Sequence, residues 1–238
     1  MKVAVVIPTI GAQHLEQCID SVLNQTHKDT VIYLFKDGLD VKIPSFVNNI
    51  PNIKQIHLDE NVGKGWYGHR VYAACSFLVN ADIICYLDED NFYEPEHVQN
   101  LVETISKGNS WAYSLRNIVD KNGEFNCTDD CESLGKWTSV INDKFFDVNC
   151  FMIPKMAAIH FSPYWYRRAR HPQEQPEVDR ILSPFMMQNF KKFDTNGEYT
   201  VNYRVASRAD SVQDVFFIEG NEVMKQRMNG EYPWRKKT

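Results

Sequence analysis

The first half of the chain alternates short apolar runs with amphipathic segments. Four runs rich in apolar and β-branched residues each stop at polar or turn-forming positions and predict buried strands at 3–7, 30–35, 53–58 and 83–87. Between them, apolar residues recur at helical spacing and predict helices, as in residues 15–22 and in the segment 66–80. This alternation predicts an α/β fold with a Rossmann-like, mostly parallel open sheet flanked by helices.

The second half has a more mixed pattern. Residues 111–119 predict a strand that turns at Asn122 and Gly123 into a hairpin. Residues 146–153 predict a further strand, and residues 177–190 a helix. No internal repeat or Gly/Ser-rich linker separates the two halves, so we predict one domain.

Three consecutive acidic residues, Asp88, Glu89 and Asp90, follow the buried run at 83–87. Side chains of a strand alternate between its faces, so Asp88 and Asp90 are expected on one face and Glu89 on the other. Two converging carboxylates repel each other unless a divalent cation lies between them, and Mg²⁺ or Mn²⁺ prefers such ligands. The pair predicts a metal site, although an acidic loop at a strand end has the same pattern.

Polar side chains recur where successive predicted strands end. Thr9 follows the first strand, Asp37 the second, and Asp88 with Asp90 the fourth. The carboxyl ends of parallel strands form one edge, where open α/β sheets bind ligands. Asp37 can accept hydrogen bonds from a base or ribose, but it also suits an Asp-Gly turn. Lys64, between two glycines, could bring a cation and backbone amides to a diphosphate.

Composition narrows the functional classes. The 238 residues are 43% hydrophobic and 24% charged, which is typical of a globular protein. A net charge of −5 argues against a nucleic-acid partner, which needs a basic surface. No apolar stretch is long enough for a transmembrane segment, and residues 2–7 are too short for a signal peptide, so we expect a cytoplasmic protein with reduced cysteines. Cys127 and Cys131 have no second ligand pair nearby, and we expect no zinc site there.

Four motifs occur in the order and spacing of a known family. They read VAVVIPT at 3–9, I-x-SVL-x-QT at 19–26, KDG at 36–38 and LDEDN at 87–91, followed by Pro95. Over about residues 2–105 the chain resembles the family 2 glycosyltransferases of GT-A fold. It differs at Lys36, where the family often has a second acid.

This resemblance implies a metal-dependent inverting glycosyltransferase with Mn²⁺ or Mg²⁺ as its cofactor. The donor would be a nucleotide-diphosphate sugar, and the acceptor a hydroxyl group, for which we expect a glycan. By position, Thr9 and Asp37 would contact the nucleoside, Asp88 the ribose or the metal, and Asp90 the metal.

The family places its catalytic base in the second half, near the start of a helix. Inversion is a single displacement, which needs a carboxylate to take the proton of the acceptor hydroxyl. The matching stretch contains Glu177 and Asp179, and we assign the base to Asp179 with Glu177 as its rival. Both could instead be acids that the helix dipole favours at a helix N-terminus.

Acceptor contacts are expected from the mixed half. Asp147 and Asn149 fall where the family's strand reaches the acceptor, although a plain strand start has the same pattern. Trp165 belongs to an aromatic and cationic stretch that suits a sugar platform or a phosphate clamp, although a surface helix has the same composition. Tyr203 and Arg204 are candidates for a phosphate contact. The expected GT-A catalytic domain, residues 1–238, would have its nucleotide-binding half up to about residue 105 and its acceptor-binding half beyond.

Two other functions share parts of this pattern. One is a non-catalytic module of the same fold that binds a nucleotide sugar or a glycan, but the presence of both Asp88 and Asp90 argues against it. The other is a sugar nucleotidyltransferase. Such enzymes carry a glycine-rich basic loop directly after the first strand, which residues 7–12 lack.

Overall fold

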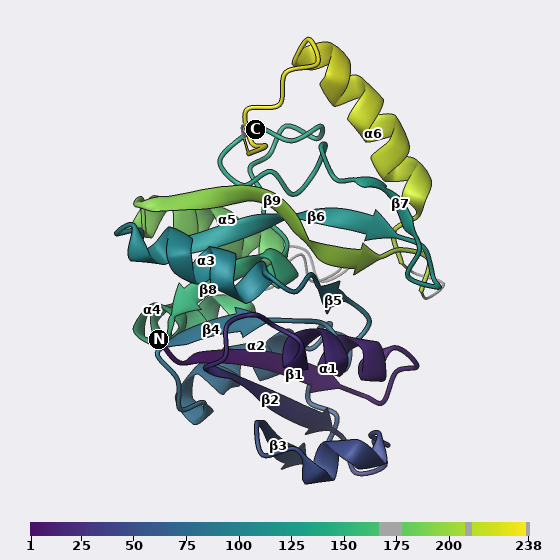
Figure 1. Ribbon diagram of the computed structural model, residues 1–238, viewed down its shortest axis with the longest axis vertical. Coiled ribbons are helices and arrows are strands. Elements are labelled where there is room, and N and C mark those ends of the chain that lie inside the picture. Colours follow the sequence, from purple (N-terminus) through teal and green to yellow (C-terminus); the bar gives the residue numbers. More distant parts are fainter. Residues whose placement is uncertain (167–177, 208–210, 237–238) are drawn as a thin grey trace.

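A computed structural model describes residues 1–166, 178–207 and 211–236. The described residues build a nine-stranded sheet with helices on both faces (Figure 1). The strands are β1 (Val3–Thr9), β2 (Thr30–Asp37), β3 (Ile53–Leu58), β4 (Ile83–Tyr86), β5 (Phe92–Tyr93), β6 (Trp111–Val119), β7 (Phe125–Thr128), β8 (Phe151–Pro154) and β9 (Phe193–Arg204). The longer helices are α1 (Leu15–Leu23), α2 (His69–Leu78), α3 (His97–Ser106), α4 (Lys155–Phe161), α5 (Val178–Asn189) and α6 (Asp214–Arg227). Short 3-10 turns are η1 (Ser45–Asn49), η2 (Val148–Cys150) and η3 (Ser162–Tyr166).

The sheet confirms the predicted fold class. Its strand order is β3-β2-β1-β4-β8-β6-β9-β5, with β7 beside β6. The first four strands are parallel, while β8 runs antiparallel to β4 and to β6. Val3 of β1 pairs with Thr30 of β2 and Ile83 of β4, so these strands end at one edge.

Local chemistry explains where elements begin. The predicted helix at 66–80 starts only at His69, because Tyr67 and Gly68 have positive φ angles of 48° and 74° that a right-handed helix cannot contain. The predicted strand at 146–153 starts only at Phe151. Asp147 instead caps a 3-10 turn, its side chain accepting a hydrogen bond from the backbone of Asn149.

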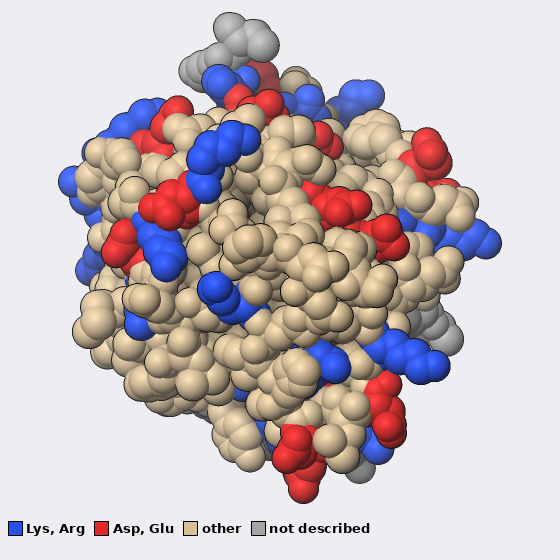
Figure 2. All heavy atoms as spheres, turned by 60° about the horizontal axis from the view of Figure 1, so that its bottom comes forward, with Lys and Arg blue, Asp and Glu red and all other residues tan. Residues whose placement is uncertain are grey.

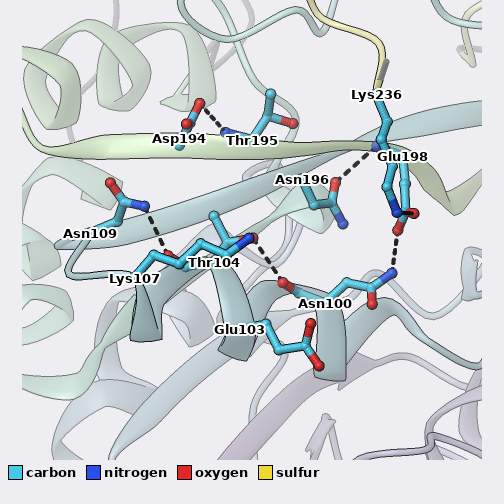
Figure 3. A pocket seen from close by; sticks show the side chains of 10 residues that line it. All are labelled: Asn100, Glu103, Thr104, Lys107, Asn109, Asp194, Thr195, Asn196, Glu198 and Lys236. Carbon is cyan, nitrogen blue, oxygen red and sulfur yellow. Dashed lines mark hydrogen bonds and ion pairs between the residues drawn. The ribbon is translucent and has the colours of Figure 1, made fainter. Parts of the chain in front are cut away.

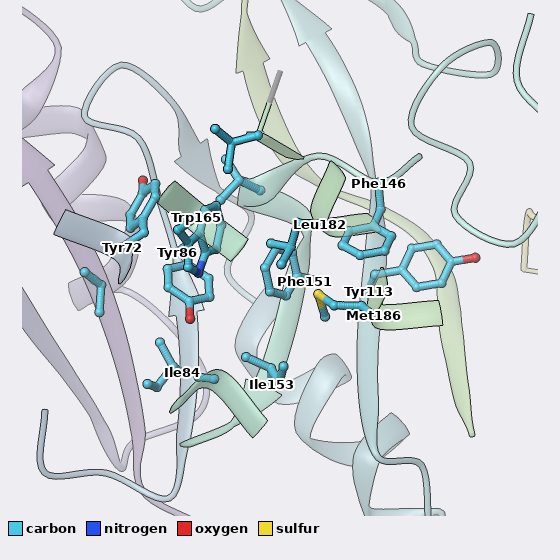
Figure 4. Close-up of a cluster of buried hydrophobic side chains, with 14 of the residues drawn as sticks. Tyr72, Ile84, Tyr86, Tyr113, Phe146, Phe151, Ile153, Trp165, Leu182 and Met186 are labelled. Atoms are coloured by element: carbon cyan, nitrogen blue, oxygen red, sulfur yellow. The ribbon is translucent and has the colours of Figure 1, made fainter. Parts of the chain in front are cut away.

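Two apolar clusters cover the two faces of the sheet. In β4, Ile84 and Tyr86 join one cluster, whereas Ile83 and Cys85 join the other. Helices α1 and α3 cover the second face, and α2, α4 and α5 cover the first. Figure 4 shows aromatic rings from α2, β4, β8 and η3 filling the first cluster. Both faces of β4 are therefore buried, which explains its unbroken apolar run.

The surface shows charges of both signs. On the face in Figure 2, acidic and basic side chains surround a middle where uncharged residues dominate. None of the helices formed by the described residues has the length and apolar composition needed to cross a lipid bilayer.

Candidate active site

A cavity of about 940 Å³ opens at the edge where β1, β2 and β4 end. The loop at 61–68, the start of α5 and the end of β9 complete its wall. Its lining includes the predicted site residues Thr9, Asp37, Lys64, Asp88, Asp90, Asp147 and Asp179. The fold thus gathers side chains that are far apart in the sequence.

Asp88 is held by two side chains that donate hydrogen bonds to its carboxylate. The hydroxyl of Tyr72 lies 2.8 Å from Oδ1, and Nδ2 of Asn149 lies 2.9 Å from Oδ2. Burial, followed by the negative charges of Asp90 and Asp147, raises the pKa of Asp88 to about 7. A cation in the cavity would favour the ionised form of this carboxyl, because it would offset the repulsion.

Asp90 faces the same cavity, and its Oδ2 accepts a hydrogen bond from the hydroxyl of Ser207 at 3.1 Å. Arg204 fixes the backbone here. Its Nε donates to the carbonyl of Asp90 at 2.8 Å, and its Nη2 donates to Oε1 of Gln17 at 2.5 Å. Arg204 therefore holds the loop after β4, and a phosphate contact would be an additional role.

Glu89 binds the loop that follows β1. Its Oε2 accepts hydrogen bonds from the hydroxyl of Thr9 at 2.5 Å and from the backbone of Ala12 at 2.9 Å. Oγ1 of Thr9 in turn accepts a hydrogen bond from the backbone of Gly11 at 2.9 Å. Thr9 lies at the cavity edge, but protein groups already engage its hydroxyl.

Asp37 joins the end of β2 to the loop at 61–68. Its Oδ1 accepts a hydrogen bond from the backbone of Val62 at 2.7 Å, and its Oδ2 accepts one from Gly63 at 2.9 Å. A Cβ atom added at Gly63 would lie 2.6 Å from Oδ2 of Asp37, so the loop needs glycine there. Asp37 thus shapes the loop from which the exposed Lys64 reaches the cavity.

Asp147 and Asn149, predicted as acceptor contacts, form a hydrogen-bonded unit. Nδ2 of Asn149 donates to Oδ1 of Asp147 at 2.7 Å, and Nη1 of Arg116 donates to Oδ2 of Asp147 at 2.6 Å. Arg116 is 1% exposed and also pairs with Asp129, at 2.8 Å, and with Glu132. Both oxygens of Asp147 are engaged, which favours a positioning role over an acceptor contact.

Asp179 lies in the first turn of α5 and at the cavity wall. Burial, followed by the charge of Asp147, raises the pKa of Asp179 to about 7. The next residue, Arg180, forms an ion pair with Glu132. A carboxyl with a pKa near 7 suits a proton acceptor at neutral pH. Its rival Glu177 lies outside the described residues.

Trp165 lies in the core. It is 1% exposed, and its ring centroid lies 5.3 Å from that of Tyr86 and 5.4 Å from that of Tyr72 (Figure 4). It is not part of the cavity lining formed by the described residues. Its placement favours a packing role in place of the predicted acceptor contact. The following aromatic and cationic residues, from 167, lie outside the described residues.

Three residues near the site were not predicted from the sequence: His69, Tyr72 and Arg116. Tyr72 and His69 were assigned only to a helix, and nothing in their spacing separates a cavity wall from a core face. Arg116 carried a usable signal, because a charge inside the apolar strand at 111–119 requires buried partners of opposite charge.

Among the described residues, no group of three or more His, Cys, Asp or Glu side chains could hold a metal ion by itself. Asp88 and Asp90 nevertheless fit Mg²⁺ or Mn²⁺, because one or two carboxylates commonly suffice when substrate phosphates and water supply the other ligands. Burial is the largest cause of the raised pKa of Asp88, and a bound cation would offset the next one, the negative charges of Asp90 and Asp147.

A second, smaller pocket of about 250 Å³ lies between α3 and β9 (Figure 3). Three of its charged side chains have partners: Glu198 binds Asn100 and Lys236, and Asp194 binds Lys136 at 2.8 Å. These pairs leave the pocket with no evident reactive group among the described residues.

The fold and the cavity define an α/β protein whose parallel strands end at a cavity, the place where open sheets of this kind bind ligands. The sequence model of the family described as "Glycosyl transferase family 2" matches residues 4–168. The chain belongs to this family.

Two relatives and a group of solved structures extend the comparison. An "Uncharacterized glycosyltransferase" of Rickettsia bellii is 28% identical over 134 residues, 52% of this chain and 18% of the relative. One of Nostoc sp. is 29% identical over 111 residues, 44% of this chain and 33% of the relative. The matched stretches are thus a minor part of these relatives.

Solved structures of S. aureus TarS share the fold at low identity. One of residues 1–349 has a TM-score of 0.65 and 12% identity, and the match covers 86% of this chain and 60% of that chain. Two others hold UDP, with a TM-score of 0.63, and UDP-GlcNAc, with a TM-score of 0.59. At this identity the likeness shows the fold.

Proposed function

We propose that the protein is a metal-dependent, inverting glycosyltransferase that moves a sugar from a nucleotide-diphosphate sugar to a hydroxyl acceptor, for which we expect a glycan. One observation carries the proposal: Asp88, Asp90 and Asp179 line the same cavity at the edge of the parallel sheet. The pair after β4 suits a metal and a diphosphate, and the acid of α5 suits a base.

The donor would lie along the edge formed by β1, β2 and β4. Thr9 and Asp37 mark the proposed nucleoside end, and Lys64 offers a positive charge to the diphosphate. The complexes of TarS with UDP and UDP-GlcNAc support a nucleotide-sugar donor and make uridine nucleotides the first to test.

Asp88 and Asp90 would hold Mn²⁺ or Mg²⁺. When bound, such a cation supplies positive charge that stabilises the departing diphosphate. Tyr72 and Asn149 fix the orientation of Asp88, so this carboxylate needs little rearrangement on binding.

Asp179 would accept the proton of the acceptor hydroxyl as its oxygen attacks the anomeric carbon. The new carbon–oxygen bond forms while the bond to the diphosphate breaks, and the nucleoside diphosphate leaves with the electron pair. One displacement inverts the anomeric configuration. In this scheme residues 1–238 act as one catalytic domain, in which the half after about residue 105 supplies the base.

A donor screen tests the proposal. Release of nucleoside diphosphate is measured with a panel of UDP- and GDP-sugars and simple glycosides, in Mn²⁺, in Mg²⁺ and in EDTA. We expect one donor to release nucleoside diphosphate, EDTA to abolish this release and added metal to restore it. The anomeric proton signal of the product, measured by NMR, should show the configuration opposite to that of the donor. Binding of a nucleotide sugar without turnover for any acceptor would instead support the non-catalytic module, and full turnover in EDTA would reject the metal.

A further inference from the structure

His69 is a buried histidine in the wall of the cavity. It is the first residue of α2, is 5% exposed and belongs to the cavity lining. Its imidazole centroid lies 5.5 Å from the ring of Trp165 and 6.2 Å from the ring of Tyr72. Since the hydroxyl of Tyr72 donates to Asp88, His69 lies on the side of the cavity that holds the proposed metal pair.

The fold leaves the imidazole of His69 incompletely bonded. Its Nδ1 is buried and has no hydrogen-bond partner among the described residues. A buried ring nitrogen without a partner costs free energy, so such atoms are rare unless a ligand or water satisfies them. Within the part of the chain that the structure describes, no group therefore fixes which ring nitrogen carries the proton.

The imidazole is also uncharged at neutral pH. Burial lowers the pKa of His69 to about 4, so one ring nitrogen donates a hydrogen bond and the other accepts one. A neutral ring among aromatic neighbours adds no positive charge for a diphosphate. It suits a group that is both donor and acceptor and that lies beside apolar C–H faces, which describes the hydroxyls of a pyranose ring.

We propose that His69 hydrogen-bonds a hydroxyl of the sugar carried by the nucleotide donor and thereby selects among donor sugars. The inference rests on the proposed glycosyltransferase function and extends it to the choice of sugar. A small rotation of the ring at the cavity wall would present its unsatisfied nitrogen to this hydroxyl.

Calorimetry on the full chain separates this role from a structural one. The titrants are the sugar nucleotides of the donor panel, with UDP and GDP as sugar-free references. His69→Phe keeps a ring but removes both nitrogens. We expect it to weaken binding of the preferred sugar nucleotide roughly tenfold, which corresponds to the loss of one net hydrogen bond. Binding of the free nucleoside diphosphate should stay unchanged. His69→Gln should recover part of the loss.

Analogues of the preferred donor that lack single sugar hydroxyls complete the test. One of these analogues should bind the wild type less tightly than the full donor does. In His69→Phe, that analogue and the full donor should bind equally tightly, because the substitution and the missing hydroxyl remove the same contact. His97→Phe is the control: His97 is also buried and its Nε2 has no hydrogen-bond partner among the residues that the structure describes, but it lies outside the cavity lining.

Equal weakening of sugar nucleotide and free diphosphate in His69→Phe, or additive losses with every analogue, would overturn the role of His69. If His69→Phe does not fold, the same analogue series on His69→Gln decides the question. If the wild type binds diphosphates but gains nothing from any sugar, the proposed glycosyltransferase function fails first, which is a separate result.

Discussion

Asn149 forms two hydrogen bonds with Asp88, one to its side chain and one to its backbone. Its Nδ2 donates to the carboxylate Oδ2 of Asp88 at 2.9 Å, and its Oδ1 accepts from the backbone N–H of Asp88 at 2.6 Å. Asn149 is fully buried, so its amide has one orientation. The orientation of the proposed metal ligand is thus set by a residue of the second half.

We therefore expect Asn149→Ala to lower Mn²⁺ affinity and activity by roughly 10- to 100-fold, the usual cost of losing a group that orients a metal ligand. Calorimetric titration with Mn²⁺ measures the change in metal affinity. Asn117→Ala is the control, because Asn117 also bonds across strands, to Asn202 at 3.1 Å, but lies outside the cavity lining. Equal Mn²⁺ affinity in both variants would contradict the positioning role.

Asp90→Asn should remove most activity while the fold persists. The side chain is partly buried at a strand end and accepts one described hydrogen bond, from Ser207, which an amide oxygen can still accept. Activity should fall by orders of magnitude and Mn²⁺ should no longer raise the melting temperature. Asp194→Asn, at a surface ion pair, should change neither quantity. Unfolding of Asp90→Asn would point to a structural role instead.

Activity should rise with pH through about 7, because Asp179 accepts a proton only when it is ionised and its pKa is raised to about 7. Asp179→Asn should reduce transfer by roughly a hundredfold to ten-thousandfold and abolish this rise, with donor binding retained. Retained transfer, or the same loss in Glu177→Gln with Asp179 intact, would reject the assignment.

The same shift has an effect on stability. The folded protein holds this proton more tightly than the unfolded chain, whose carboxyl has a pKa near 3.8. The contribution of Asp179 to the free energy of unfolding is therefore lost as pH rises from about 4 to about 7. Urea unfolding of Asp179→Asn should show a weaker loss of stability over that interval than the wild type.

Asp37→Ala should lower both stability and nucleotide affinity. It leaves the backbone amides of Val62 and Gly63 without their acceptor, at a cost of about 1–3 kcal/mol, and it loosens the loop that carries Lys64. Urea unfolding and titration with UDP measure the two effects. Asp40→Ala, an exposed acid of the following loop, is the control. Reduced UDP affinity with an unchanged free energy of unfolding would indicate that Asp37 contacts the nucleoside and does not hold the loop.

The parallel half of the fold was predictable because its central strands, β1 and β4, are buried along their whole length and therefore have unbroken apolar runs. The run before Asp88 is short, which favours a central strand over a helix, and the polar residue after each run marks the sheet edge. Thr9, Asp37, Asp88 and Asp90 could therefore be assigned to one cavity from sequence.

The rest depended on tertiary contacts. Strand β9 contains Asp194, Asn196 and Gly197, which disfavour strands, and it forms because the long partner β6 pairs with it. Trp165 was predicted to contact a sugar, because the sequence pattern of an aromatic residue beside arginines is the same whether its ring lies in the core or at the surface. The link from Arg116 through Asp147 to Asn149 joins side chains of different segments, which sequence spacing does not show.

The pairing of β4 with β8 joins the two halves through main-chain hydrogen bonds, with Ile84 opposite Ile153 and Cys85 opposite Met152. A chain cut after residue 105 would leave β4 as an open edge with unpaired N–H and C=O groups along an apolar run. We expect such a fragment to pair with a second copy of itself and precipitate, whereas the complementary fragment would lose one of the two strands that flank β8. We expect the pieces to become soluble only when they are produced together, as a split protein that reassembles along this seam.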